Sequence, residues 1–378
     1  MNTQRVVRLV RRPNGRAEPD IFDLQDAPIP TPGPGEFLLR NLTLSMDPAM
    51  LQRLRGEANY AESVEVGQIM HAYGVGQVIA SNHPAVRVGE IRLGRVDMAE
   101  YALQSDPDES TVLNLGIASE EAYLSVCGIT GATAIFSLFD LGEPKAGETI
   151  VISAGGSSVG ATVMQLAKRA GMRTVGIVST DEKAARMRQK WGYDAAVSYR
   201  GKSVETLAAD LAAVCPNGVD LYYDNTSGDI SEALLDLYNE RARILVIGRL
   251  GISHLSDSKD DVGRRDNNVL LTKRIRKQGF VLLDYKPRMK GGILLLAKWV
   301  KSGALKAETD VLEGIDRVPE AFFRMVNGQN QGKQLVRLAQ ADARLDPSPR
   351  WLGRALTSRL FPTRTLATVL TRGLRVPR

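Results

Sequence analysis

The sequence predicts an α/β protein of two domains, in which a β-rich domain comes first and a doubly wound parallel sheet follows. The chain has 378 residues, more than one hydrophobic core usually accommodates. Short β-like runs with many glycines and prolines fill residues 1–126. Strand-like and helix-like runs then alternate between Cys127 and Ser302.

The β-rich part is predicted from its turn residues and its alternating hydrophobicity. The stretch "PIPTPGPGEFLLRNLTLSMDP" has a proline-glycine entry, after which Phe37 to Leu42 alternate as a half-buried strand would. "YGVGQVIAS" and "AEYALQ" are further candidate strands. We therefore expect a compact β-rich domain.

In the second part, strands and helices follow one another singly. Strands are expected at Thr149–Ser153, Arg173–Val178, Asp194–Ser198, Val219–Asp224 and Ala242–Ile247. Helices are expected between them, at Val159–Ala170, Asp181–Trp191, Ser203–Val214 and Ile230–Tyr238. Single helices between strands imply parallel pairing through right-handed crossovers. The ligand crevice of such a sheet lies at the carboxyl ends of its strands.

The chain after Lys301 is expected to return to the first domain, because the parallel sheet is by then complete. It contains a strand-like run at Glu308–Leu312, a helix at Pro319–Val326 and a closing strand at Lys333–Leu338. An arginine-rich tail begins at Asp342.

Composition and charge exclude several classes of protein. No apolar run approaches the roughly 18 residues that span a bilayer. Residues 1–12 lack the apolar centre of a secretory signal, and two distant cysteines make no disulfide framework, so we expect a cytoplasmic protein. The net charge of +6 resides in residues 342–378, with eight Arg and two Asp; a neutral body is not expected to bind nucleic acid.

The stretch "TIVISAGGSSVGATVMQLAK" has the layout of a dinucleotide-binding turn between a strand and a helix. The frame G-x-G-x-x-G/A reads here Gly155-x-Ser157-x-x-Gly160. The Cβ of Ser157 obstructs close approach of the backbone to a pyrophosphate unless the turn takes another path. The amides of Ser157 to Gly160 would still point from a helix N-terminus. An ordinary strand–turn–helix is the alternative, and the surrounding alternation favours a nucleotide site.

The end of the second strand indicates which cofactor would bind. NAD sites place Asp or Glu about 20 residues after the glycines, to hold the ribose 2′-hydroxyl. "VGIVSTDEK" instead places Ser179 and Thr180 at the strand end and Lys183 on the first helical turn. Two hydroxyls and a cation suit a 2′-phosphate, which favours NADP(H). The alternative is a charged helix start capped by Thr180, which does not explain the missing acid.

Several stretches together resemble one family over residues 5–340. They include "LSMDPAMLQR", "VGQIMHAYGVGQVIAS", "CGITGATAIFSL", "KAGETIVISAGGSSVGATVMQLAKRAG", "YYDNTSGDI", "KQGFVLLDY" and "VPEAFFRMVNGQNQGKQLVRL". The chain resembles the zinc-independent medium-chain dehydrogenases/reductases, in the branch of prostaglandin, alkenal and curcumin reductases. The resemblance implies a GroES-like catalytic domain (1–126 and 304–340), a Rossmann domain (127–303) and an added tail (341–378). It also implies NADPH bound between the domains and reduction of activated C=C bonds in α,β-unsaturated ketones and aldehydes, and we expect a homodimer.

The resemblance also assigns site residues. Family cofactor contacts map onto Thr130, Ser157, Ser158, Val159, Gly160, Lys183, Tyr199, Asn225, Gly248 and Asn330, and Ser179 joins them by its place at the strand end. Candidate groups to polarise the substrate are Tyr60, Ser253 and Tyr285; packing is the alternative role for each tyrosine.

The chain departs from the family pattern at three places. Asp47-Pro48-Ala49-Met50-Leu51 replaces D-P-Y-M-R, and Ser157 replaces a glycine. Many relatives read C-G-A-I-S-x-Y-N after the fifth strand, with a tyrosine proposed to assist proton delivery, and Ser253 stands in its place here.

The sequence predicts no metal site and is compatible with two other functions. His71-Ala72 replaces the G-H-E of the zinc-dependent relatives, and His71, His83 and His254 have no metal-ligand spacing. A related quinone oxidoreductase would share the fold and the cofactor. The second alternative is a nucleotide-binding protein that has lost turnover, and the features that support it are Ser157 and the substituted loop tyrosine.

The tail is predicted to form two short amphipathic basic helices. "PRWLGRALTSRLF" spaces Leu352, Leu356 and Leu360 on one face, and Leu366, Val369 and Leu370 follow Pro362. The tail is either a docked extension or a weak, salt-sensitive contact with an anionic membrane or partner.

Overall fold

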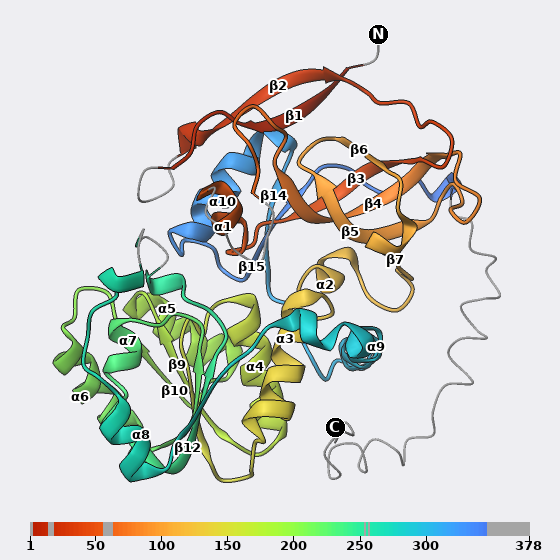
Figure 1. Cartoon of the computed structure of the whole chain (residues 1–378). Helices are drawn as coiled ribbons and strands as arrows, with labels where there is room; N and C mark the ends of the chain where they lie inside the picture. Colours follow the sequence, from red (N-terminus) through yellow and green to blue (C-terminus); the bar gives the residue numbers. More distant parts are fainter. Residues whose placement is uncertain (1–2, 14–18, 56–62, 253–254, 256–257, 346–378) are drawn as a thin grey trace. The chain divides into compact units, whose positions relative to one another are not determined.

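The computed structural model describes residues 3–13, 19–55, 63–252, 255 and 258–345, and it divides into two compact units (Figure 1). Among the described residues, the first unit comprises 3–124 and 309–345, and the second comprises 125–308. The predicted class, a β-rich domain combined with a Rossmann-type parallel sheet, is confirmed. Most of the predicted tail, residues 346–378, lies outside the described part.

A seven-stranded sheet forms the centre of the first unit. Its strands follow the order β14-β15-β3-β4-β5-β7, and β6 pairs with β3. The strands are β3 (Phe37–Ser45), β4 (His71–Ser81), β5 (Ile91–Asp97), β6 (Tyr101–Gln104), β7 (Ser110–Val112), β14 (Thr309–Glu313) and β15 (Lys333–Arg337). The residues after Glu308 thus rejoin this unit, because β15 pairs antiparallel with β3.

Shorter elements complete the first unit. They are the antiparallel pair β1 (Thr3–Leu9) and β2 (Phe22–Pro28) and the helices α1 (Met50–Arg55), α2 (Glu120–Tyr123) and α10 (Val318–Val326). The expectation of a half-buried strand at Phe37 is wrong, since every residue of β3 except Arg40 is buried. This strand is central in the sheet, since β4, β6 and β15 all pair with it.

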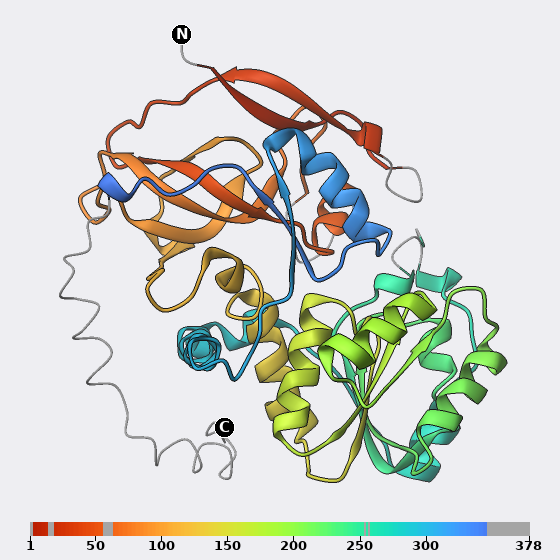
Figure 2. The same cartoon turned by 180° about the vertical axis from the view of Figure 1, so that it is seen from behind.

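The second unit is built on a six-stranded parallel sheet with helices on both faces (Figures 1 and 2). Its order is β10-β9-β8-β11-β12-β13, the doubly wound order, with the switch point beside β8. The strands are β8 (Thr149–Ile152), β9 (Arg173–Val178), β10 (Ala195–Ser198), β11 (Val219–Asp224), β12 (Tyr238–Val246) and β13 (Arg276–Gly279). Sequence patterns predict five of them and miss β13, whose four residues are all exposed at the sheet edge.

The helices of this unit are α3 (Ile129–Phe136), α4 (Ser158–Arg169), α5 (Asp181–Arg186), α6 (Val204–Val214), α7 (Asp229–Glu232), α8 (Asn267–Lys273) and α9 (Lys286–Lys301). The helix predicted at Ile230–Tyr238 is largely wrong, because α7 ends at Glu232 and turns follow. Tyr238 already pairs with Val219 in the sheet, so strand pairing overrides helix propensity there.

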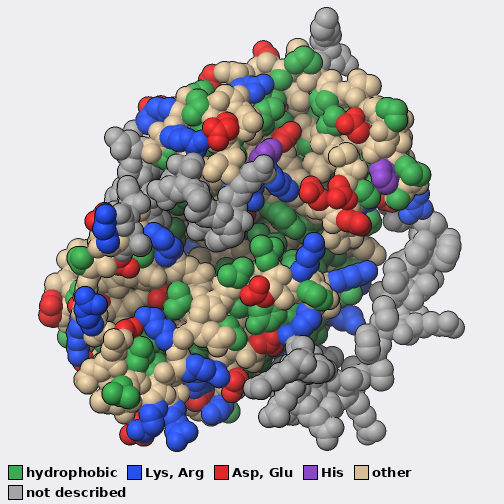
Figure 3. Space-filling model, viewed as in Figure 1, with side chains coloured by type: hydrophobic (Ala, Val, Ile, Leu, Met, Phe, Trp, Pro, Cys, Tyr) green, Lys and Arg blue, Asp and Glu red, His purple; other side chains and the backbone are tan. Residues whose placement is uncertain are grey.

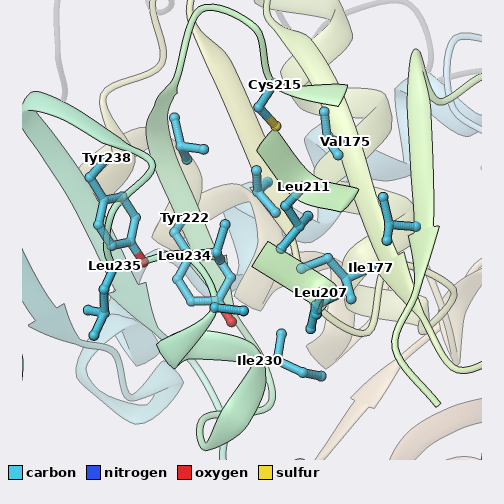
Figure 4. Close-up of a cluster of buried hydrophobic side chains, with 14 of the residues drawn as sticks. Val175, Ile177, Leu207, Leu211, Cys215, Tyr222, Ile230, Leu234, Leu235 and Tyr238 are labelled. Carbon is cyan, nitrogen blue, oxygen red and sulfur yellow. The ribbon is translucent and has the colours of Figure 1, made fainter. Parts of the chain in front are cut away.

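Buried side chains hold α6 and the α7 region against the sheet (Figure 4). Leu207 and Leu211 of α6 pack with Val175 and Ile177 of β9, and Tyr222 of β11 lies in the same cluster. The helical spacing of the two leucines directs both to one face, which is how a half-polar helix covers a parallel sheet.

The surface view shows Lys, Arg, Asp and Glu interspersed over the visible face (Figure 3). No helix in the described part of the chain is long and apolar enough to cross a membrane.

Candidate functional site

The turn after β8 positions the N-terminus of α4. Ser157 is the N-cap of this helix, and its Oγ accepts a hydrogen bond from the Gly160 amide at 3.1 Å. The Ser157 amide donates to the Ala154 carbonyl at 2.8 Å. The next amides, at Ser158 and Val159, have no acceptor within the helix, so they are donors available to an anion.

Close packing explains which residues of the turn must be glycine. A Cβ at Gly160 would lie 2.6 Å from the Ala154 carbonyl oxygen, and one at Gly155 would lie 2.7 Å from Met187 Cε. A Cβ at Gly156 would meet nothing closer than Val178 Cγ1 at 3.6 Å. The turn therefore depends on Gly160, where backbone leaves no room for a Cβ, and uses Ser157 as a cap.

The end of β9 places hydroxyls and a lysine together. Thr180 caps α5 and accepts from the Lys183 amide at 3.3 Å, while Ser179 is buried beside it. Asp181 accepts a hydrogen bond from the Ser198 hydroxyl, so its carboxylate is engaged by the end of β10. The Tyr199 amide donates to the Val178 carbonyl at 2.9 Å, which holds Tyr199 next to the end of β9.

Thr130 lies beside the start of α4. Its Oγ1 donates to the Ser125 carbonyl at 2.7 Å and lies 3.0 Å from Ser158 Oγ. A Cβ at Gly131 would lie 1.8 Å from the Val126 carbonyl oxygen, which explains the glycine that follows Thr130.

A polar network fixes the ends of β8, β11 and β12. The Asn225 amide donates to Ser153 Oγ at 2.8 Å, and its Nδ2 donates to the Ser153 carbonyl at 2.7 Å. The Gly248 amide donates to the Asp224 carbonyl at 3.1 Å. The buried Asp224 carboxylate accepts from the Tyr222 and Ser231 hydroxyls and from the Thr226 and Ser227 amides.

Sequence reasoning missed Ser153 and Asp224. The polar run "DNTSGD", which begins at the last residue of the buried strand β11, is the signal that would have identified Asp224. Burial raises the pKa of Tyr222 well above its usual range, so its hydroxyl remains a donor to Asp224.

The structure thus gathers most predicted cofactor residues at the carboxyl ends of β8 to β12. They are Thr130, Ser157, Ser158, Val159, Gly160, Ser179, Lys183, Tyr199, Asn225 and Gly248. Asn330 belongs to the first unit, where its Nδ2 donates to the Gly332 carbonyl at 2.6 Å.

The predicted catalytic residues are placed less completely. Tyr60 and Ser253 lie outside the described residues, as does His254. The Tyr285 ring stacks on Phe136 and on Phe280, each with 5.1 Å between ring centroids. The Arg288 guanidinium lies 5.6 Å from the centre of the Tyr285 ring, so this ring packs against three side chains.

Within the described ranges, no group of three or more His, Cys, Asp or Glu is arranged to hold a metal ion. His71 Nδ1 lies 2.9 Å from Asp97 Oδ1, and both line a polar cavity of about 220 Å³ in the first unit. Burial raises the pKa of Cys127 to about 12 and that of Cys215 to about 11. The two thiols are therefore protonated at neutral pH.

Comparisons with known proteins place this arrangement in a family. A family described as the N-terminal domain of oxidoreductase matches residues 5–112, and one described as zinc-binding dehydrogenase matches 158–298. The putative NADP-dependent oxidoreductase YfmJ of Bacillus subtilis is 36% identical, covering 89% of this chain and 98% of its own. The NADPH-dependent curcumin reductase of Escherichia coli is 34% identical, covering 88% and 96%.

A solved structure agrees with these relatives. The crystal structure of CurA from Vibrio vulnificus in complex with NADPH has a TM-score of 0.81 and 33% identity, over 89% of this chain and 99% of that one. The chain therefore belongs to the medium-chain dehydrogenases/reductases, in the zinc-independent branch that contains the curcumin, alkenal and prostaglandin reductases.

Proposed function

We propose that this protein is an NADPH-dependent reductase that saturates the activated C=C bond of α,β-unsaturated ketones and aldehydes. The observation that carries the proposal is the pairing of two local features in the second unit. The α4 N-terminus presents unpaired amides after a glycine turn, and the neighbouring β9 ends in hydroxyls and Lys183 instead of a ribose-binding acid. The named activities of the relatives supply the substrate class.

The proposed cofactor site uses the residues gathered at the strand ends. The amides of Ser158 and Val159 at the start of α4 would hold the pyrophosphate, with Ser157 and Gly160 fixing the turn. Ser179 and Lys183 would hold the 2′-phosphate. The remaining contacts are proposed for Thr130, Tyr199, Asn225, Gly248 and Asn330.

Enone reduction requires few catalytic side chains from the protein itself. Bound NADPH supplies the hydride that reaches the β-carbon of the alkene. The chain must orient the substrate and place a donor near the carbonyl oxygen, where enolate charge develops. We propose Tyr60 and Ser253 as candidates for this donor ahead of Tyr285, whose ring stacks between two phenylalanines.

The test is NADPH oxidation by the purified protein against a panel of enones and enals and a panel of quinones, with analysis of the products. The proposal expects saturated ketones or aldehydes and no comparable turnover of quinones. Turnover of quinones alone would establish the related oxidoreductase instead. NADPH binding without any turnover would indicate a nucleotide-binding protein that lost catalysis.

We further propose a homodimer that forms through β13, the edge strand of the parallel sheet among the described residues. All four residues of β13 are exposed, and Leu271, Val281 and Leu283 nearby are 77%, 45% and 64% exposed. An open edge beside apolar side chains favours pairing with a second copy. Sedimentation should give a dimer that Leu283→Glu weakens, whereas a monomeric wild type would refute this.

We also propose that the protein is located in the cytoplasm. Cys127 and Cys215 are both free and buried, as suits a reducing compartment. Fractionation of the source cells with an antibody against the chain tests this location.

A further inference from the structure

We propose that Tyr193 is a positioning residue, whose buried hydroxyl locks the glycine turn in the shape that presents the α4 amides to the cofactor pyrophosphate. This inference rests on the proposed function, because it deepens the account of the cofactor site. Tyr193 lies between Gly192 and β10, and only 4% of it is exposed. Its Oη lies 3.0 Å from the Gly155 carbonyl oxygen and 3.1 Å from that of Gly160.

These two contacts join both ends of the turn. Gly155 opens it, and Gly160 belongs to the first turn of α4. Burial raises the pKa of Tyr193 well above its usual range, so the hydroxyl keeps the proton that it donates. Within the described residues, no other hydrogen bond to the Gly155 carbonyl is observed, and that residue is itself buried. The phenol thus satisfies a buried acceptor as well as joining the turn.

The turn has reasons to need such a lock. Ala154, which leads into it, has a φ of 46°, a left-handed conformation that is unfavourable for a residue with a Cβ. The backbone at Gly160 also passes so close to Ala154 that no side chain fits between them. A strained and tightly wound segment keeps its shape only when its surroundings hold it.

The space around the ring is shaped to admit Tyr193. A Cβ at Gly176 of β9 would lie 3.0 Å from Tyr193 Cε1 and 2.5 Å from Met187 Cε. A Cβ at Gly155 would lie 3.1 Å from the Tyr193 hydroxyl. Glycines from the strand and from the turn therefore both make room for the tyrosine.

The expected consequence of losing the hydroxyl follows from these contacts. Phenylalanine would keep the ring in place but leave the turn without its donor, so the turn would populate other shapes. Apparent cofactor affinity falls in proportion to the fraction of molecules in the competent shape. If the cost of leaving a buried acceptor without its donor falls wholly on the competent shape, the NADPH Kd rises roughly 5- to 140-fold.

The experiment compares Tyr193→Phe with Tyr223→Phe. Tyr223 is also fully buried in this unit, but its hydroxyl lies 2.6 Å from Ser137 Oγ, at the start of the π-helical turn that follows α3. Each variant loses one buried phenol hydroxyl and keeps the ring, so both should lower Tm by similar amounts. Only Tyr193→Phe should weaken NADPH, and it should bind adenosine 2′-monophosphate, which has no pyrophosphate, within twofold of wild type.

A second variant perturbs the lock from the strand side. Gly176→Ala pushes the ring away from the turn, so it should reproduce the selective loss of NADPH affinity while the Tyr193 hydroxyl remains in the sequence. Hydrogen exchange of the amides at 155–161 should quicken in both lock variants and stay unchanged in Tyr223→Phe.

The outcomes separate this inference from the proposed function. Wild-type protein that does not bind NADPH overturns the proposed function and this inference with it. Wild-type binding combined with unchanged NADPH affinity in Tyr193→Phe and Gly176→Ala overturns this inference alone. Equal weakening of NADPH in Tyr193→Phe and Tyr223→Phe, or equal weakening of both ligands in Tyr193→Phe, would also overturn it.

Discussion

Replacement of Ser157 tests how the turn functions without its middle glycine. Its Oγ caps α4 by accepting from the Gly160 amide at 3.1 Å. Ser157→Ala removes that acceptor, and loss of an N-cap costs about 1 kcal/mol of unfolding free energy. For a unit of this size, that corresponds to a fall in Tm of about 2–4 °C. Ser157→Gly should cost only a few tenths of a kcal/mol, because glycine is tolerated at N-caps.

The same variants separate capping from direct phosphate binding. If Ser157 acts only as a cap, Ser157→Gly should bind NADPH within about threefold of wild type, since the amides of α4 stay in place. If the hydroxyl also donates to the pyrophosphate, both variants lose a charge-assisted hydrogen bond of about 1.5–3 kcal/mol, or roughly 10- to 100-fold in affinity. In the cap the Ser157 Oγ is an acceptor, so its O–H can still donate to a phosphate, and the two variants decide between the roles.

A matched control comes from a second helix of the same unit. Ser203 caps α6, and its Oγ accepts from the Thr206 amide at 3.2 Å. Ser203→Ala should lower Tm as Ser157→Ala does and leave NADPH affinity unchanged. Calorimetric titration with thermal unfolding of the variants is the assay. A tenfold or greater loss of NADPH affinity in Ser157→Gly, with Tm unchanged, would refute the capping account.

Three further predictions follow from the same structure. Lys183→Ala should weaken the binding of NADPH roughly 10- to 100-fold and leave the binding of NADH nearly unchanged. Lys190→Ala, on the segment after α5, is the control and should change the affinity for neither cofactor. Equal loss of affinity for both cofactors in Lys183→Ala would contradict the 2′-phosphate assignment. Lys333 is 4% exposed and forms an ion pair with Asp47. Lys333→Met should lower the free energy of unfolding in urea by about 3–5 kcal/mol, because the Asp47 carboxylate is left buried without a counter-charge. A loss below about 1 kcal/mol would contradict this. Deleting residues 346–378 should leave NADPH binding intact and abolish any low-salt association with anionic vesicles; loss of folding would show that the tail is part of the body.

Local patterns predict the parts of the fold that depend on local residues. The alternation of strands and helices identifies β8 to β12, because each is a buried run between helical segments. It misses β13, since the sequence Arg-Lys-Gln-Gly has no apolar residue and its strand form comes only from pairing with β12. The helix predicted from Ile230 fails for the same reason, because pairing with Val219 draws Tyr238 into the sheet.

The candidate site divides in the same way. The glycine frame and the Ser179–Lys183 segment are readable because each occupies a few consecutive residues. The contact of Tyr193 with Gly155 joins residues 38 positions apart and depends on the space left at Gly176, so no local pattern reveals it. The bonds of Asn225 to Ser153 span 72 positions and depend on the pairing of β8 with β11.

The most direct test of the central claim is the fate of the transferred hydrogen. The protein is incubated with an α,β-unsaturated ketone and NADPH deuterated at the nicotinamide C4 position that donates the hydride, and the product is examined by NMR. The account predicts a saturated ketone that carries one deuterium atom on the former β-carbon. Deuterium on the carbinol carbon of an unsaturated alcohol, which forms by hydride transfer to the carbonyl carbon, would contradict it. Unchanged enone after prolonged incubation with cofactor-binding protein would also contradict it.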